Sequence, residues 1–415
     1  MRVGWIVPGF QGNGDEPGIP ALTSLAVELR GVMDVRVFTV RFPPRDSEYE
    51  IQGIPVTSFG AAPRSGNRFR WRAASARRWL RVLSAVRAAH RRAPFDTLHG
   101  FWATEAGMLA SFAGRLLGIP VTASICGGEL ASARQAGYGN RLHRWERAQV
   151  GFSLQMAAAI GVGSDDSRSR LAARYPWLVA KIRDLPLGFD PRFFTPTATP
   201  VNTETVVCVA SWSPVKDHLL LLDGFHILSR RRPSARLLLV GERTDGAEAV
   251  AAIDKRGLAG GVRPLGYLPP REVAAVFAGA QLSVITSWHE AECLAVVESL
   301  ASGTPVVATP VGIARQLLRD PMLGTIVASR TPEAMADAVE YMLRRTKDEQ
   351  RHMRLARAAA VEHLTMDRVA ARFAAHYREL AGGRRGGHWA YRGRTEKVSN
   401  HGNTEGTEDT EDARG

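Results

Sequence analysis

The chain has 415 residues, of which 45% are hydrophobic, so it can bury substantial cores and should form two or three domains. No apolar run approaches the roughly 20 residues that span a bilayer, and the N-terminus enters a strand instead of a signal peptide, so we expect a cytoplasmic protein. The three cysteines lie too far apart for a disulfide framework or a zinc site, and the net charge of +13 calls for an anionic partner. Nucleic acid, an acidic membrane and phosphorylated small molecules all fit that charge.

The first elements predict half of a doubly wound sheet. Residues 2–7 read as a strand, a loop containing Gly9 and Gly12 comes next, and a helix and a second strand at residues 35–40 complete the unit. A phosphate would lie on such a loop. Because the glycines do not form the dinucleotide fingerprint, a merely flexible turn is an equal alternative.

The region between Arg64 and Arg92 is the most basic part of the chain and also carries tryptophans and leucines. A helix with an apolar aromatic face and arginine flanks is typical of a protein that lies on anionic lipid. An ordinary surface helix is the alternative. Since no nucleic-acid motif accompanies the charge, base-specific binding is not favoured.

Another strand, helix and strand are expected at residues 95–125. His99 is expected near the end of the first strand, where a lone histidine is more often structural than functional. The second strand leads into Cys126-Gly127-Gly128-Glu129, whose glycines allow a ligand close to the backbone.

Residues 195–205 are rich in Pro and Thr and predict a linker between two domains. The second domain would open with a strand at residues 206–210 and a turn from Ser211 to Lys216. A lysine at such a turn can reach a diphosphate on the next helix, or it can simply be solvated.

Residues 283–310 predict a strand, a helix and a parallel strand, with Glu290 and Glu298 in the turn and helix between them. Acids at these places often complement the helix dipole or form a solvated face. Glu298, however, lies between Val297 and Leu300 on a helix that should be buried, so its carboxylate needs a partner such as a ligand hydroxyl.

The two glutamates, with seven residues between them and SLASGTPVVA after the second, resemble the E-x7-E signature of retaining glycosyltransferases of the GT-B fold, family 4. The resemblance implies an α/β protein with two doubly wound, Rossmann-like domains that face a central cleft. Its parts would be an acceptor-side domain (1–194), the linker (195–205), a nucleotide-sugar domain (206–364) and a helix that returns to the first domain (365–381). Residues 382–415 lie outside the resemblance, and because they have few apolar side chains we expect a disordered tail.

The resemblance also implies roles for residues at the motif. Glu290 would hold sugar hydroxyls, and Glu298 would accept hydrogen bonds from the donor ribose. Lys216 would offset charge on the departing diphosphate, while Leu294 and Ala295 would offer backbone N–H groups at the helix N-terminus.

Further donor contacts would come from loops at the same sheet edges, and His99 matches the histidine of a D-x-x-H segment. The donor contacts are Gly266, Tyr267 and Leu268 at the nucleobase, together with Ser211, Gly9 and Gly12. The chain departs from the family where Ser211 replaces an arginine, where Cys126 replaces a histidine, and where Ala291-Glu292-Cys293 replaces a G-F-G segment. We therefore expect Glu292 to crowd or replace the sugar contact of Glu290.

The implied reaction moves a sugar from a nucleotide-diphosphate sugar to an acceptor hydroxyl with retention, using the leaving phosphate as base. The acceptor would be a glycan, a lipid-linked molecule or a small molecule, in glycan, polysaccharide or glycolipid biosynthesis. No metal or other cofactor is expected, and the sequence has no D-x-D cluster. The alternatives are a nucleotide-sugar epimerase of the same fold and a non-catalytic, basic membrane- or RNA-binding protein on a degenerate version of it.

Overall fold

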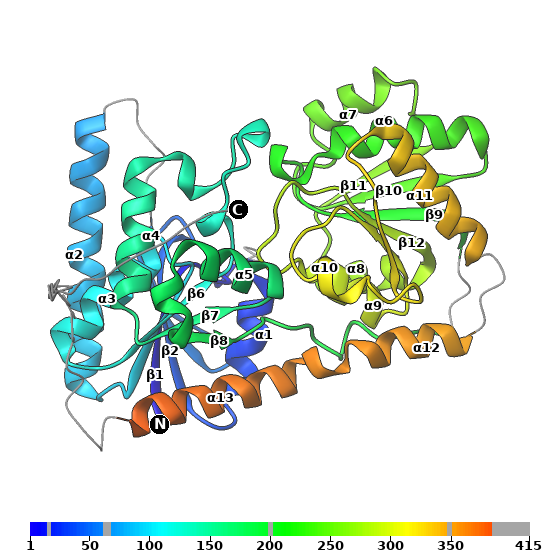
Figure 1. Ribbon diagram of the computed structural model, residues 1–415. Coiled ribbons are helices and arrows are strands. Elements are labelled where there is room, and N and C mark those ends of the chain that lie inside the picture. The colour runs from blue at the N-terminus through cyan, green and yellow to red at the C-terminus, as the bar shows by residue number, and fades with distance from the viewer. Residues whose placement is uncertain (15–17, 61–67, 198–201, 347–350, 384–415) are drawn as a thin grey trace, which may run out of the picture.

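The computed structural model describes residues 1–14, 18–60, 68–197, 202–346 and 351–383, without the side chains of 68–73, 202 and 203 (Figure 1). Arg64 and nearly all of the predicted tail lie outside the described residues. The described chain forms two bodies, each a mainly parallel sheet with helices on both faces (Figure 1). This arrangement confirms the predicted α/β class with two doubly wound domains.

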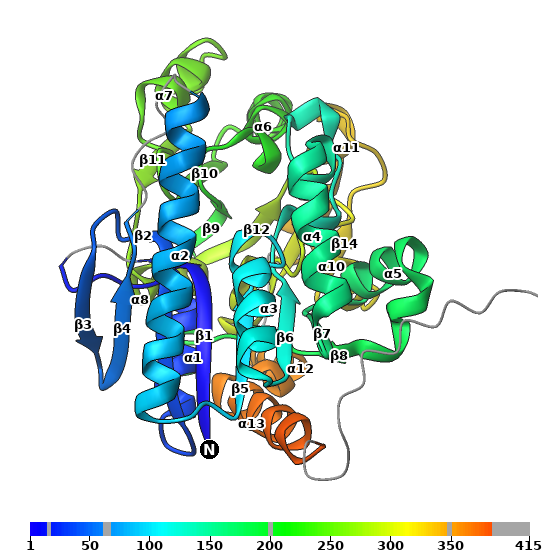
Figure 2. The same cartoon turned by 90° about the vertical axis from the view of Figure 1, so that its left-hand side faces the viewer.

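The first sheet has eight strands in the order β3-β4-β2-β1-β5-β6-β7-β8, parallel except for β3 against β4. Its strands are β1 (Arg2–Gly9), β2 (Asp34–Phe42), β3 (Ser47–Ile51), β4 (Ile54–Ser58), β5 (Thr97–Phe101), β6 (Val121–Ile125), β7 (Ala159–Val162) and β8 (Ile182–Asp184). The helices are α1 (Pro20–Leu29), α2 (Arg68–Arg92), α3 (Glu105–Leu117), α4 (Arg144–Met156) and α5 (Asp165–Arg174). Helices α2, α3 and α4 lie side by side on the outer face (Figure 2).

The second sheet has six parallel strands in the order β11-β10-β9-β12-β13-β14. The strands are β9 (Asn202–Val209), β10 (Arg236–Val240), β11 (Val262–Gly266), β12 (Ala280–Ile285), β13 (Val306–Ala308) and β14 (Gly324–Ile326). The helices of this half are α6 (His218–Arg231), α7 (Ala247–Asp254), α8 (Pro270–Gly279), α9 (Leu294–Ala301), α10 (Ala314–Leu317), α11 (Pro332–Arg345) and α12 (Arg351–Ala360).

The strand orders create a switch point in each sheet, where successive connections leave in opposite directions. The switch points lie between β1 and β5 in the first sheet and between β9 and β12 in the second. Every residue of β5 and of β12 is buried, as expected for parallel strands covered on both faces. Ligands of such folds bind beyond the carboxyl ends of the strands at the switch point.

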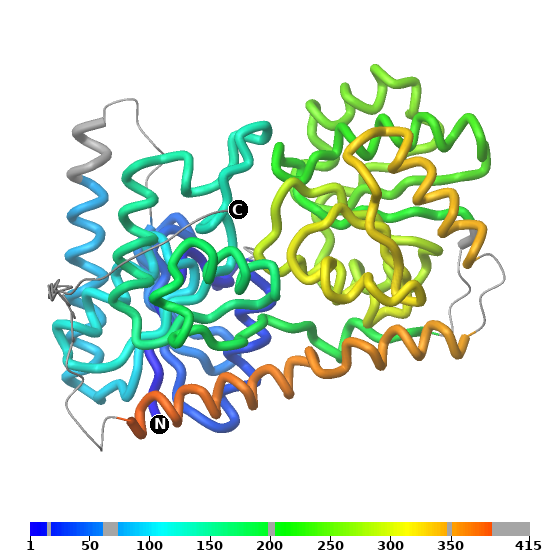
Figure 3. The backbone as a smooth tube through the Cα atoms, in the orientation of Figure 1, coloured from blue at the N-terminus to red at the C-terminus, as the bar shows by residue number. Residues whose placement is uncertain are grey.

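Helix α13 (Met366–Gly382) comes after the second half in sequence but packs on the first sheet (Figure 3). Phe373 and Tyr377 are fully buried there, and the indole N–H of Trp5 donates to the Tyr377 hydroxyl at 3.1 Å. Burial of a phenylalanine stabilises a fold by about 1.5–3 kcal/mol, so this helix ties the two halves together.

The predicted linker extends too far at its C-terminal end. Strand β9 begins at Asn202, not at residue 206, and Asn202 and Thr205 lie in the sheet opposite Ala280 and Arg236. The threonines made the segment look like a linker, but threonine is also a good strand former, and the sheet neighbours decide between the two.

Helix α2 falls within the predicted basic region, and two of its arginines are already paired. Arg78 is buried against Glu105 at 2.8 Å, and Arg81 lies 2.7 Å from Asp46. In the part of the chain that the structure describes, no helix is long and apolar enough to cross a membrane.

Candidate active site

Lys216 and Glu290 meet at the switch point of the second sheet. Lys216 ends the short 3₁₀ helix (Pro214–Lys216) after β9, and Glu290 lies in the loop after β12. The Lys216 ammonium is 2.6 Å from a Glu290 carboxylate oxygen, which also accepts a hydrogen bond from the Ser287 hydroxyl at 2.6 Å. Burial lowers the pKa of Lys216, but the charge and the hydrogen bond of Glu290, together with smaller contributions from Cys293 and Tyr138, raise it above its ordinary value. The ammonium is therefore a fixed positive charge at this edge.

Glu298 is half-buried in the middle of α9, one residue after Val297. No hydrogen bond or ion pair of its carboxylate is formed within the described residues, and burial raises its pKa to about 7. A carboxyl group so placed favours a ligand that can donate hydrogen bonds.

The first turn of α9 starts from an unusual backbone conformation. Cys293, the residue before the helix, has φ of 75°, a left-handed conformation in which glycine is at ease and cysteine is strained. Leu294 and Ala295 come next and are half-buried. Their N–H groups have no partner within the helix because of their position in its first turn, so they can bind an anion.

Glu292 does not crowd Glu290, contrary to the expectation from its sequence position. Its two carboxylate oxygens both lie 3.0 Å from the backbone N–H of Leu187, on the first half of the chain. The carboxylate also fills the space beside Gly163, where an added Cβ would lie 2.3 Å from it. Burial raises the pKa of Glu292 to about 7, although the N–H groups of Leu187 and Gly188 lower it. Glu292 thus joins the two halves of the molecule.

Other contacts hold the same loop against the first domain. The His289 ring nitrogen Nε2 lies 3.1 Å from the carbonyl oxygen of Gly127. The hydroxyls of Ser164 and Ser167 donate to the carbonyl oxygen of Ala291 at 2.5 and 2.7 Å. The residues that carry Glu290 are therefore fixed from both domains.

The predicted nucleobase loop borders a pocket of about 600 Å³ between the two domains. Tyr267 is 45% exposed, and it lines this pocket opposite Gln11 and Gly14 of the loop after β1. Gly266 has φ of 69°, and an added Cβ would lie 2.6 Å from the Asp245 carboxylate, so the turn requires glycine. The turn is also held by the Gly241 N–H, which donates to the Gly266 carbonyl at 2.8 Å.

The remaining predicted donor residues lie on the expected loops but do not line that pocket. Gly9 ends β1, and an added Cβ there would meet the Phe42 side chain at 3.0 Å. Gly12 is buried in the loop after β1, while Ser211 and Leu268 are half-buried after β9 and β11.

His99 is not at the cleft, so its predicted catalytic place is wrong. It lies inside β5 with no exposed surface, and its ring nitrogens contact the hydroxyls of Tyr377 at 2.6 Å and Ser124 at 2.8 Å. The ring stacks on Phe101 with centroids 3.9 Å apart. Burial lowers the pKa of His99 well below its ordinary value, as expected for a neutral core side chain.

Two residues of this region were not indicated by any motif in the sequence. Arg330 lies after β14, donates to the carbonyl oxygens of Thr286 and Ser287 at 2.9 Å, and stacks over Trp288 at 3.7 Å. Tyr138 approaches from the first domain, with its ring 6.1 Å from that of His289. Only the tertiary fold brings such distant residues to the loop. Among the described residues, no group of three or more His, Cys, Asp and Glu side chains is arranged to hold a metal ion.

Comparison with known proteins assigns this architecture to a class. Residues 190–360 match the family "Glycosyl transferases group 1", and residues 20–188 match "Glycosyl transferase 4-like domain". The chain therefore belongs to the group 1 glycosyltransferases of the GT-B fold, a class of transferase enzymes, as the E-x7-E resemblance predicted.

Individual relatives cover less of the sequence. A D-inositol 3-phosphate glycosyltransferase from Segniliparus rotundus is 30% identical over 38% of this chain, and one from Mycobacterium bovis is 28% identical over 44%. The matches span 34% and 40% of those relatives' own length.

Solved structures share the fold over nearly the whole chain. A sucrose-phosphate synthase from Thermosynechococcus elongatus has a TM-score of 0.73 at 19% identity, covering 92% of this chain and 100% of that chain. The Anabaena protein HepE in complex with UDP-glucose has a TM-score of 0.69 at 17% identity, covering 91% and 100%.

Proposed function

We propose that the protein is a retaining glycosyltransferase that moves a sugar from a nucleotide-diphosphate sugar to an acceptor hydroxyl, in glycan, polysaccharide or glycolipid biosynthesis. One observation carries the proposal. A charged Lys216–Glu290 pair and the carboxyl group of Glu298, which has no partner among the described residues, lie on the segments after two neighbouring strands at one switch point. A diphosphate and a ribose diol are complementary to these groups.

The donor is proposed to bind mainly to the second domain. Glu298 would accept hydrogen bonds from the ribose hydroxyls, and the first-turn N–H groups of α9 would contact the diphosphate or the sugar. Tyr267 and its loop would border the base. Because HepE was solved with UDP-glucose, that donor is the first to test.

The Lys216 ammonium would stabilise the negative charge that develops on the leaving diphosphate. The acceptor hydroxyl oxygen forms a bond to the anomeric carbon as the bond between that carbon and the phosphate oxygen breaks. The hydroxyl proton passes to the leaving phosphate on the same face, so the configuration is retained and a nucleoside diphosphate departs. Glu290 would hold a sugar hydroxyl while keeping Lys216 in place.

A thermal-shift screen of nucleotide sugars tests donor binding, because a ligand that binds only the native state raises the melting temperature. We expect one donor class to stabilise the wild type and to lose this effect in Glu298→Ala. Unchanged donor binding and turnover in that variant would refute the proposal. Release of nucleoside diphosphate only when acceptor is added separates a transferase from an epimerase.

We also propose that the outer face of the first domain contacts an anionic membrane on its cytoplasmic side. Leu80 on α2 and Trp145 on α4 are 66% and 55% exposed, and the exposed Arg77, Arg87 and Arg91 of α2 add positive charge. Apolar side chains among arginines favour the surface of anionic lipid. In a flotation assay, the protein should bind vesicles containing phosphatidylglycerol and not neutral ones. Equal binding to both, or to neither, would refute this surface.

A further inference from the structure

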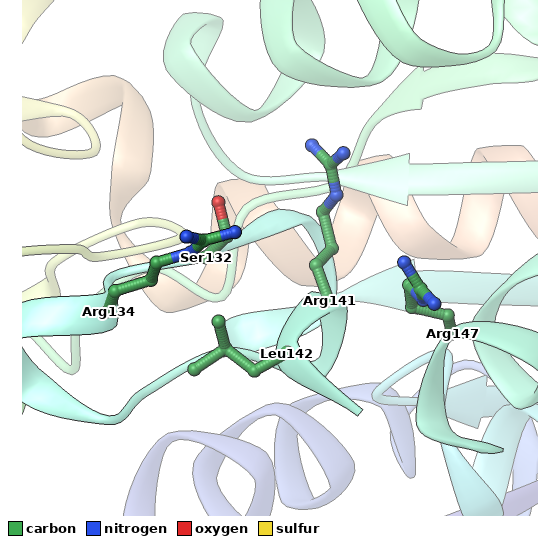
Figure 4. Close-up of a pocket in the computed structure, with 5 residues that line it drawn as sticks. All are labelled: Ser132, Arg134, Arg141, Leu142 and Arg147. Carbon is green, nitrogen blue, oxygen red and sulfur yellow. The ribbon is translucent and has the colours of Figure 1, made fainter. Parts of the chain in front are cut away.

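Three arginines surround a pocket of about 490 Å³ on the first domain (Figure 4). Arg134 lies in the 3₁₀ helix η2 (Arg134–Ala136), Arg141 in η3 (Asn140–Leu142) and Arg147 in the first turns of α4. Arg134 and Arg147 approach from opposite sides with Arg141 between them, and Leu142 and Ser132 complete the lining (Figure 4). Segments of different conformation thus bring their cations to one place.

The three guanidinium groups have no acidic partner among the described residues, although acids lie close in sequence. Glu146 accepts a hydrogen bond from the Asn140 amide at 3.0 Å. Glu129 is buried and accepts from the backbone N–H groups of Ala103, Cys126 and Gly127. All three side chains are exposed, so the pocket presents positive charge without a local acidic partner, and a bound anion would neutralise it.

The pocket lies on the acceptor side of the proposed active site. A second cavity, of about 280 Å³, is also lined by Arg141 and Arg147, and its other lining residues include Glu129, Arg174 and Tyr175. Glu129 holds the loop of Gly127, whose carbonyl oxygen meets His289 beside Glu290. A short, continuous segment of the protein therefore connects the pocket with the loop of Gly127 at the cleft.

We propose that this pocket binds a phosphate group on the acceptor, an assignment that rests on the proposed transferase function. Guanidinium forks match phosphate oxygens in pairs, and three of them fit the charge of a phosphate better than that of a single carboxylate. An acceptor anchored at Arg141 and Arg147 would extend along the loop of Gly127 toward His289 and the cleft. The phosphate belongs either to a free phosphate ester or to a lipid headgroup.

Titration calorimetry with inorganic phosphate tests the pocket without any donor. The test variant is Arg141→Gln/Arg147→Gln, and the control is Arg230→Gln, an exposed arginine on α6 that forms no ion pair within the described chain. The double variant should lose a binding component that the wild type and the control share, since each charge-assisted contact changes affinity about tenfold or more. Identical isotherms for the three proteins would overturn the proposal. Because the assay needs no turnover, it stands apart from any failure of the transferase function.

Kinetics then identify the source of the phosphate. Alcohol acceptors are offered free and as soluble phosphate monoesters, and vesicles with and without anionic phospholipid are added in separate arms. If the acceptor is a free ester, the double variant should raise KM for the monoester at least tenfold and leave KM for the free alcohol unchanged. If the phosphate belongs to a lipid headgroup, the double variant should lose only the stimulation by anionic vesicles. Equal KM values and equal stimulation in variant and wild type would contradict both assignments.

Discussion

The Lys216 ammonium and the Glu290 carboxylate lie 2.6 Å apart although 74 residues separate them in the chain, because β9 and β12 are neighbours at the switch point of the second sheet. Both side chains are mostly buried, at 25% and 14% exposed. Removing either partner leaves the other charge partly buried and unpaired, whereas removing both partners leaves no unpaired charge.

A double-mutant cycle with Lys216→Met and Glu290→Gln should therefore be strongly non-additive. We expect each single change to lower the free energy of unfolding by about 1–3 kcal/mol, and the double change to cost at least about 1 kcal/mol less than their sum. The exposed pair Arg231 and Asp337 is the control, for which we expect the two single changes to be additive because solvent screens the pair. Urea unfolding measures all of these, and additive values for Lys216 and Glu290 would contradict the account.

As the pH rises from about 4.5 to about 7, Glu298 should lower the free energy of unfolding. Burial raises its pKa to about 7 in the folded protein, so in this range the unfolded chain releases a proton that the native state keeps. Glu298→Gln removes this loss. The free energy of unfolding of the variant, minus that of the wild type, should therefore be about 2–3 kcal/mol larger at pH 8 than at pH 5. Urea midpoints at the two pH values measure the difference. An unchanged pH dependence in the variant would refute the burial of that charge.

Donor binding should show the opposite trend with pH. Ribose hydroxyls donate to the ionised form of Glu298, so donor affinity should decrease as the pH falls below about 7, by up to tenfold per unit. Calorimetric titration of the wild type from pH 8 to pH 5.5 measures this. A flat profile would exclude a titrating carboxylate at the ribose.

Glu292 should control the opening of the contact between the domains. Glu292→Ala removes the acceptor for the Leu187 N–H, while Glu292→Gln keeps one acceptor oxygen. Hydrogen exchange at Leu187 and Gly188 should be faster in the alanine variant than in the glutamine variant or the wild type, because the amide hydrogen bond is lost. Equal exchange in all three proteins would show that the contact is not maintained in solution.

His99 should matter for stability and not for chemistry. His99→Ala removes a buried ring and two hydrogen bonds, so we expect a loss of about 2–4 kcal/mol in unfolding free energy. The kcat per folded molecule should be unchanged. A fall in kcat without destabilisation would restore the catalytic role.

The sequence predicted the class of fold because the relevant signals are local. Apolar runs ending at glycine turns, and the E-x7-E segment with its strand, helix and strand, identify parallel units without tertiary knowledge. The same units placed Lys216, Glu290 and Glu298 on the segments directly after two strands of one sheet. Because the carboxyl ends of parallel strands meet at the same edge of a sheet, this placement is enough to predict that the three residues lie at one sheet edge.

Other features depend on side-chain direction and on long-range packing. Near the end of a strand, one residue decides whether a side chain reaches the cleft or the core, and His99 points to the core. Glu292 bonds to Leu187, 105 residues away, and Arg330 reaches Ser287 across the sheet edge. No local pattern in the chain encodes these pairings.

Release of nucleoside diphosphate in the presence of donor and acceptor, compared between the wild type and Lys216→Gln, tests the central claim most directly. The Arg230→Gln variant serves as the control, and all proteins are assayed where they are folded. We predict that kcat falls by about 100-fold or more in Lys216→Gln, because a preorganised charge at the leaving group is removed. Turnover equal to that of the wild type would contradict a transferase centred on Lys216 and Glu290.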